Sequence, residues 1–320
     1  MHLKTTFLFS IILLSMCFFA CKERNDDFPP VSWSTYYHDK THPPVTSMLI
    51  LNDHCEWFGL DDNGGVVYGN GISHEQYSAD KSSIPFDSVT SLLLDGNNVL
   101  WAGHKKGLAK FTNNQWEIIP QFQGLHITSL AVKGIGEIWV GFHGTSVSGG
   151  LAVKNDNNWT FFPDAPSRLV NSLLVDRLQQ LWVGTEDAGL FKLDGNTWRS
   201  VTEDLSLAEP ASITCICNEP GGNVTAGTKA SQLIIFSDKE PLLLTTGTSK
   251  PIGSLLYDTN GKLWIATSGA GLLTLEGSTW GNYNVSNAKL PSDTILALSR
   301  HPDNFIIAAF PDGRLLNFPY

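Results

Sequence analysis

The sequence predicts an all-β protein, a seven-bladed β-propeller with four-stranded blades. Three observations predict this fold. A segment of about forty residues recurs seven times, each copy reads as short apolar runs separated by Gly, Asn or Asp turns, and the ten Trp fall at only two positions of the repeat. Four short strands in a repeat of this length are typical of a propeller blade.

The copies differ in strength but share one template. "VNSLLVDRLQQLWVGTEDAGLFKLDGNTW" shows it in full, with "SLLV", "LWVG", "GLFKL" and the segment around the second Trp as the four strands. The copies start 38 to 44 residues apart, at Val45, Val89, Ile127, Val170, Ile213, Ile252 and Thr294. They fill residues 31–320, which we therefore expect to form a single propeller domain.

The last copy stops before its fourth strand. Ile306 occupies the position of the first Trp, so the second Trp would fall just beyond Tyr320. At the other end, Trp33 lies twelve residues before Val45, and Trp116 lies a similar eleven residues before the next copy. We expect the strand around Trp33 to complete the last blade and close the ring, because an unpaired sheet edge is an aggregation liability.

The ten Trp predict how the blades pack. A bulky aromatic side chain that recurs at a fixed position of a repeat is explained most simply by packing between neighbouring blades. The first position holds Trp57, Trp101, Trp139, Trp182 and Trp264, and the second holds Trp33, Trp116, Trp159, Trp198 and Trp280. This use of every Trp leaves none for a dedicated sugar-stacking platform.

The N-terminal segment predicts export. Residues 1–20 combine Lys4 with an apolar run that is too short to span a membrane, and they read as a signal peptide. A small residue directly before Cys21 resembles a bacterial lipoprotein signal, in which Cys21 carries the lipid; an ordinary signal peptide cut nearby is the alternative. Residues 21–30 then form a tether, and we expect the protein to be held at the outer membrane by this lipid anchor alone.

Composition excludes one class of partner. The formal net charge is −10 and no basic run is present, whereas nucleic-acid binding needs a basic surface. Cys215 and Cys217 lie two residues apart and offer a soft metal two ligands, but without a second pair they are better explained as small buried residues. We expect no cofactor, no metal and a monomeric propeller.

Candidate ligand-binding residues lie in the loops at one end of the predicted channel. The loops between second and third strands and those that precede first strands meet at this end. Polar or aromatic residues that depart from the repeat there form a shallow site, in which Phe142 or Phe310 supplies an apolar floor. The candidates are His104, Lys105, His126, Phe142, His143, Arg168, Glu186, Asp187 and Phe310.

Two classes of function fit these residues. The first is a non-catalytic binding module, whose partner is a glycan or an envelope protein. The alternative is a propeller lyase or hydrolase in which His and Glu side chains act with a divalent metal at the channel mouth. No nucleophile elbow, His-Glu-x-x-His motif or P-loop is present, so we do not expect an enzyme.

The core of the repeat resembles the two-component regulator propeller family. "LWVGTEDAGL" at residues 181–190 and the copies "LWAGHKKGL", "IWVGFHGTSVSGGL" and "LWIATSGAGL" follow a Val-x-Ser-Leu strand, as in that family. Together with the lipoprotein signal they resemble lipoprotein propellers of Bacteroidota. The resemblance implies a periplasmic or cell-surface propeller related to glycan sensing, because such propellers commonly form the sensor regions of membrane-bound kinases that respond to glycans.

Overall fold

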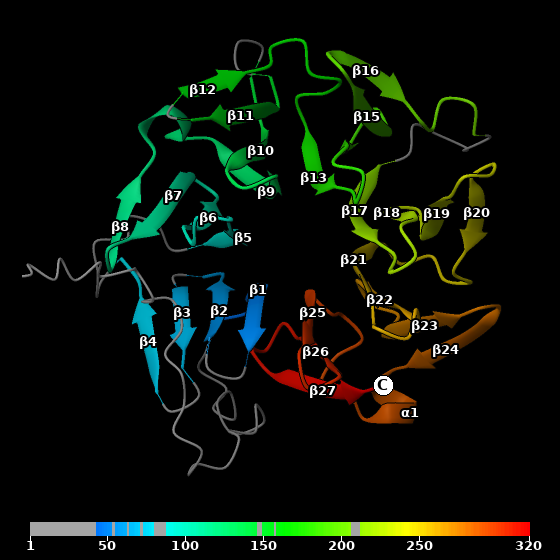
Figure 1. The fold of residues 1–320 in the computed structure, drawn as a ribbon. Helices are drawn as coiled ribbons and strands as arrows, with labels where there is room; N and C mark the ends of the chain where they lie inside the picture. Colours follow the sequence, from blue (N-terminus) through cyan, green and yellow to red (C-terminus); the bar gives the residue numbers. More distant parts are fainter. Residues whose placement is uncertain are drawn as a thin grey trace, which may run out of the picture.

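The computed structural model describes residues 43–52, 55–62, 64–70, 73–79, 88–145, 149–156, 158–205 and 212–320. They form seven antiparallel sheets arranged in a ring around a central axis (Figure 1), six of them with four strands and the last with three. The predicted all-β, seven-bladed propeller is therefore confirmed. No helix among these residues has the length and apolarity that a membrane span requires.

The first three blades follow one another along the chain. Blade 1 contains β1 (Val45–Asn52), β2 (Cys55–Leu60), β3 (Gly65–Gly69) and β4 (His74–Tyr77). Blade 2 contains β5 (Val89–Leu94), β6 (Leu100–His104), β7 (Gly107–Thr112) and β8 (Gln115–Ile118), and the 3-10 helix η2 (Pro120–Phe122) follows it. Blade 3 contains β9 (His126–Lys133), β10 (Glu137–His143), β11 (Leu151–Asn155) and β12 (Asn158–Phe161).

The remaining blades repeat this order. Blade 4 contains β13 (Val170–Val175), β14 (Leu181–Thr185), β15 (Leu190–Asp194) and β16 (Thr197–Ser200). Blade 5 contains β17 (Ile213–Asn218), β18 (Val224–Thr228), β19 (Gln232–Phe236) and β20 (Leu242–Thr245). Blade 6 contains β21 (Ile252–Tyr257), β22 (Leu263–Thr267), β23 (Leu272–Glu276) and β24 (Thr279–Tyr283), and α1 (Val285–Ala288) follows it. Blade 7 contains β25 (Ala297–His301), β26 (Phe305–Ala309) and β27 (Leu315–Pro319).

The first strand of each blade lies nearest the axis (Figure 1), and these strands are joined around the ring. β1 lies against both β5 and β25, so blade 7 meets blade 1. The hydroxyl of Thr90 donates a hydrogen bond of 2.7 Å to the carbonyl of Ile127 in the next blade, and Thr128 donates one of 2.6 Å to the carbonyl of Val170. A side chain at one repeat position thus ties each of these blades to the next.

Close packing between blades explains the glycine in the Trp-Val-Gly segment. A Cβ at Gly184 would lie 2.6 Å from Cγ2 of Ile213, the buried residue that starts the next blade. Gly103 stands in the same relation to Ile127, at 2.5 Å. A larger side chain would separate the blades, because real carbon atoms do not approach so closely.

A buried Asp holds the second-strand Trp in three blades. Asp258 is fully buried, and its Oδ2 accepts a hydrogen bond of 2.9 Å from Nε1 of Trp264. Its Oδ1 accepts from the backbone N–H groups of Asn260 and Lys262, which closes the turn between the first two strands. Blades 2 and 4 repeat the arrangement with Asp95 and Asp176. One carboxylate therefore fixes both the turn and the indole.

The predicted packing of the Trp side chains is confirmed at the first repeat position, where all five are buried, and for Trp116 at the second. Trp280 differs, because 39% of it is exposed. Blade 5 carries Thr225 where blades 1 to 4 and 6 carry a second-strand Trp, so Trp280 has no indole to pack against in the preceding blade. Trp33 lies outside the described residues, and its role in closing the ring stays a prediction.

The seventh copy begins one residue later than the sequence suggested. Ile295, rather than Thr294, is the buried residue that packs with Trp264 and Ala266 of blade 6. Ile307, rather than Ile306, then takes the Trp position and packs with Val45 of blade 1. His301 occupies the place of the turn Asp, and its Nδ1 accepts a hydrogen bond from the backbone N–H of Asp303.

Candidate functional site

Polar side chains gather at the end of the ring where first strands begin and second strands end. We name this end the rim. Two consecutive repeat positions build it, immediately after the Gly or Ala of the second strand. The first position is buried in every blade, as Leu60, His104, Phe142, Thr185, Thr228, Thr267 and Phe310. The second position is polar in six blades, as Asp61, Lys105, His143, Glu186, Lys229 and Ser268.

Three predicted site residues lie at the buried position. Phe142 is fully buried among aromatic side chains, with its ring centroid 6.0 Å from that of Phe122. Phe310 is also fully buried, in the core between blades 6 and 7. His104 is 4% exposed, and burial together with the nearby Lys106 lowers its pKa to about 4. The structure therefore places these three side chains in the blade interior, not on the rim where they were expected.

Glu186 lies at the centre of the rim network. Its Oε2 accepts hydrogen bonds of 2.7 Å from Asn171 Nδ2 and from the Ser212 hydroxyl, and its Oε1 is 2.7 Å from Nζ of Lys229. Partial burial alone would raise the pKa of this carboxyl, but the bonds from Lys229, Ser212 and Asn171 outweigh burial and lower the pKa to about 2. Glu186 is therefore an anion at neutral pH, and it joins blade 4 to blade 5.

The network continues into blade 3 through two histidines. His126 and His143 face each other across the ladder of β9 and β10, with ring centroids 5.0 Å apart. Nε2 of His143 lies 3.2 Å from Oδ1 of Asn171. Burial, with His143 and Lys105 nearby, lowers the pKa of His126, so this ring is neutral at pH 7. A continuous polar chain thus runs from His126 through His143, Asn171 and Glu186 to Lys229.

The other rim candidates lie outside this chain. Lys105 is exposed and forms an ion pair of 2.7 Å with Asp61, which links blades 1 and 2. Arg168 and Asp187 are exposed, and Oδ1 of Asp187 accepts a hydrogen bond from the Ser167 hydroxyl. The rim therefore presents donors and acceptors from several blades, with the histidines and Glu186 joined through Asn171 rather than converging on one point.

Among the residues that the structure describes, no three His, Cys, Asp or Glu side chains lie close enough together to hold a metal ion. Cys215 and Cys217 are free thiols there, and burial raises the pKa of Cys215 to about 12. Burial also raises the pKa of Cys217. Both thiols therefore stay protonated at neutral pH. The proposed lipidation site Cys21 lies outside the described residues.

Sequence reasoning missed Asn171, Ser212 and Lys229 as members of the site. A signal for Asn171 was present, because the same repeat position holds Thr46, Thr90, Thr128 and Thr214 in other blades. The amide keeps the inter-blade bond that Thr46, Thr90 and Thr128 make, donating to the carbonyl of Ile213 at 3.1 Å, and it also donates to Glu186. Asn171 therefore differs from the repeat in residue type, keeps the hydrogen bond between blades and adds a second hydrogen bond within the site.

The comparisons with known proteins agree with this architecture. Residues 246–269 match the family model described as two component regulator propeller. The extracellular domain of BT4673, assigned to a hybrid two component system of B. thetaiotaomicron, is similar at 16% identity with a TM-score of 0.72, over 88% of this chain and 38% of that one. The extracellular domain of BT3049 from the same organism is similar at 16% identity with a TM-score of 0.71, over 87% and 39%.

A third solved structure has a comparable size. YCF48 bound to D1 peptide is similar at 16% identity with a TM-score of 0.65, over 88% of this chain and 94% of that one. No curated protein matches. This chain spans about two fifths of the length of the two B. thetaiotaomicron chains, and at these identities the likeness shows the fold. The resemblance inferred from the Trp-Val-Gly segments is thereby confirmed: the chain is a seven-bladed propeller that carries sequence of the two-component regulator propeller repeat.

Proposed function

We propose that this chain is a non-catalytic binding module of the cell envelope, which holds a glycan at the rim. The observation that carries the proposal is the polar chain from His126 through Asn171 and Glu186 to Lys229. It offers imidazole, amide, carboxylate and ammonium groups side by side. Glycan hydroxyls both donate and accept hydrogen bonds, so they are complementary to such an alternating surface.

The ionisation states favour binding over acid–base catalysis. Glu186 has a pKa of about 2 and carries no proton to donate at neutral pH, which removes it as a general acid. His143 is held at the Asn171 amide oxygen, 3.2 Å away. His104 is buried. No observation on the described residues favours the lyase or hydrolase alternative, which placed these side chains around a metal ion.

Envelope location is part of the proposal. The likeness to extracellular domains supports export, and the sequence motif supports a lipid on Cys21 that holds the propeller at the outer membrane. Growth of producing cells with an alkyne-labelled palmitate tests the anchor. The protein should carry the label, and Cys21→Ser should lose it; label retained by that variant would disprove acylation at Cys21.

Thermal unfolding against a panel of neutral and acidic oligosaccharides tests glycan binding. A ligand at a hundred times its dissociation constant stabilises the folded state by about 2.7 kcal/mol. Asn171→Ala should abolish that stabilisation, because it removes the bridge between His143 and Glu186. Asn218→Ala is the matched control, since Asn218 also donates to a carbonyl of the neighbouring blade, Val175 at 3.2 Å, but belongs to no part of the rim.

Three outcomes are informative. A sugar-dependent shift that Asn171→Ala loses and Asn218→Ala keeps supports a glycan site on the rim. An equal shift in both variants would place the sugar elsewhere. No shift with any oligosaccharide would refute the glycan proposal, and cross-linking in intact envelopes would then search for a protein partner.

A further inference from the structure

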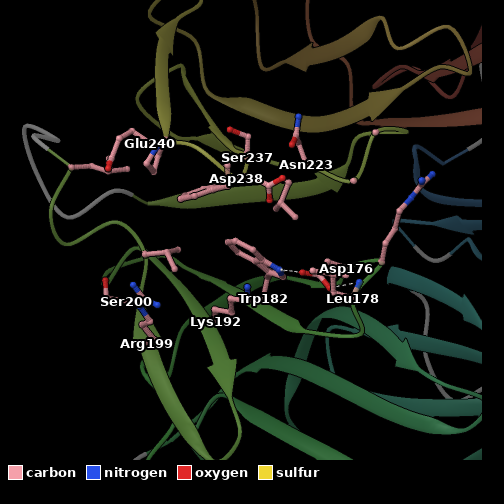
Figure 2. Close-up of a pocket in the computed structure, with 18 of the residues that line it drawn as sticks. Asp176, Leu178, Trp182, Lys192, Arg199, Ser200, Asn223, Ser237, Asp238 and Glu240 are labelled. Carbon is pink, nitrogen blue, oxygen red and sulfur yellow. Dashed lines mark hydrogen bonds between the residues drawn. The ribbon is translucent and has the colours of Figure 1, made fainter.

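A cavity of ≈ 680 Å³ lies between blades 4 and 5, alongside the indole of Trp182 (Figure 2). Its walls include the turns between first and second strands at Asp176 to Leu178 and at Gly221 to Asn223. The turn between β19 and β20, at Ser237 to Pro241, forms another wall. The cavity shares none of its lining residues with the rim.

The repeat explains why this interface is hollow. In each of the first six blades, one fourth-strand residue lies opposite the first core residue of the third strand. In blades 1, 3 and 6 this residue is Tyr77, Phe162 and Tyr283, respectively. In blade 4 the same position holds Val201, whose backbone N–H bonds to the carbonyl of Leu190. Blade 4 thus carries an isopropyl group where blades 1, 3 and 6 carry an aromatic ring and where blades 2 and 5 carry the larger aliphatic Ile119 and Leu244.

The blade 5 side of the cavity lacks the fourth-strand Trp that most blades carry. The fourth-strand Trp of blades 2, 3, 4 and 6 lies three residues before that position, opposite the third strand. In blade 5 the last pair of this ladder is Ile235 with Leu242, so the next position outward brings Pro241 opposite Phe236. Pro241 therefore stands where the repeat places an indole. In the interface between blades 1 and 2, Tyr77 and Trp116 fill these two positions and contact each other, with centroids 6.1 Å apart.

The floor of the cavity is aromatic and rigid. Trp182 lies 5.3 Å from Phe236 between ring centroids, and its indole N–H donates a bond of 2.8 Å to Asp176. Nζ of Lys192 lies over the indole, 5.0 Å from its centroid. Val201 and Val224 complete an apolar surface that offers further contacts to a ring.

The two walls differ in net charge, because the lining of blade 4 holds three cations and two carboxylates, whereas that of blade 5 holds two carboxylates and no cation. Lys192 and Arg199 lie on the blade 4 wall, and Asp238 and Glu240 lie on the blade 5 wall across the cavity (Figure 2). Arg199, Asp238 and Glu240 are exposed. The field across the opening therefore orients a ligand that has a negative group on one side and a positive group on the other.

We propose that this cavity receives an aromatic side chain, presented by a partner polypeptide between an acidic and a basic residue. The ring occupies the space that Tyr77 and Trp116 fill between blades 1 and 2, above Trp182 and Phe236. The acidic neighbour faces Lys192 and Arg199, and the basic neighbour faces Asp238 and Glu240. The volume lies within the range of small-ligand sites and accommodates a ring together with its flanking residues. This partner site is independent of the glycan site on the rim.

A capped tripeptide, Glu-Trp-Lys with 5-fluorotryptophan at its centre, probes the cavity directly by fluorine NMR titration of the full protein. Val201→Phe restores the aromatic side chain found in other blades and should abolish binding by filling the cavity. Leu244→Phe is the matched control, because Leu244 holds the same repeat position in blade 5 and faces blade 6 instead. The affinity of the unlabelled Glu-Ala-Lys peptide is measured by how well it displaces the bound fluoropeptide. This affinity should be at least about tenfold lower than that of the Trp peptide, since aromatic anchors dominate such contacts.

Arg199→Glu gives a second measurement that does not depend on repacking the core. It reverses one wall charge at an exposed position and should weaken Glu-Trp-Lys while strengthening Lys-Trp-Lys. Equal affinities for the Trp and Ala peptides would overturn the proposal, and so would an affinity that Val201→Phe leaves unchanged. Displacement of the peptide by an oligosaccharide would overturn the proposal and assign the cavity to a glycan. Glycan binding at the rim is tested separately, by the loss of sugar-dependent stabilisation in Asn171→Ala.

Discussion

The carboxylate that holds Trp264 offers a sharp test of how the blades are stabilised. Asp258→Asn keeps the shape of the side chain and keeps an oxygen for the backbone N–H groups of Asn260 and Lys262. The new amide N–H₂ then faces the indole N–H, 2.9 Å from the position of Oδ2, and two donors cannot bond. A lost charge-assisted bond is worth about 1.5–3 kcal/mol, and the stranded indole donor adds a similar cost. We expect Asp258→Asn to lower the free energy of unfolding by about 3 kcal/mol.

Urea unfolding monitored by circular dichroism measures this free energy, and the change in tryptophan emission reports the local environment. Glu219→Gln is the matched control, because Glu219 holds the same turn position in blade 5, where Thr225 replaces the Trp. With no indole to strand, it should cost under about 1 kcal/mol, as removal of an ordinary hydrogen bond does. A loss below about 0.5 kcal/mol for Asp258→Asn would refute the assigned role of the carboxylate.

Two further predictions concern the blade interfaces and pH. Gly184→Val should destabilise the fold by about 2–3 kcal/mol, because its Cβ meets Ile213 at 2.6 Å, whereas Gly253→Ala, with no neighbour closer than 3.8 Å, should be nearly neutral in the same urea assay. Burial, with Lys106, lowers the pKa of His104 from 6.5 to about 4, so the unfolded chain binds the proton more readily between these values. This contribution to stability is complete above pH 6.5 and falls by about 2 kcal/mol by pH 5. His104→Thr, the residue of blades 4 to 6, should flatten the fall in stability between pH 7 and pH 5; an unchanged pH dependence would contradict this origin.

The candidate site was harder to predict than the fold. In a propeller each blade is covered on both faces by its neighbours, so the alternation of side chains along a strand does not separate buried from exposed positions. His104 and Phe142 stand where blades 4 to 6 carry Thr, and both side chains lie in the interior. Their neighbours Lys105 and His143, one residue further, are the ones that reach the rim.

Repetition is what the sequence by itself determined. Seven copies of one pattern fix the number of blades, the strands within each and the positions of the Trp, because a unit that cannot bury its own apolar faces must stack against its copies. Tertiary structure alone decided which departures from the pattern face solvent, that Asn171 joins the histidines to Glu186, and that Val201 and Pro241 leave a cavity between blades 4 and 5. These features depend on side chains of two different blades at once, and their meeting is set by the closure of the ring rather than by any local segment.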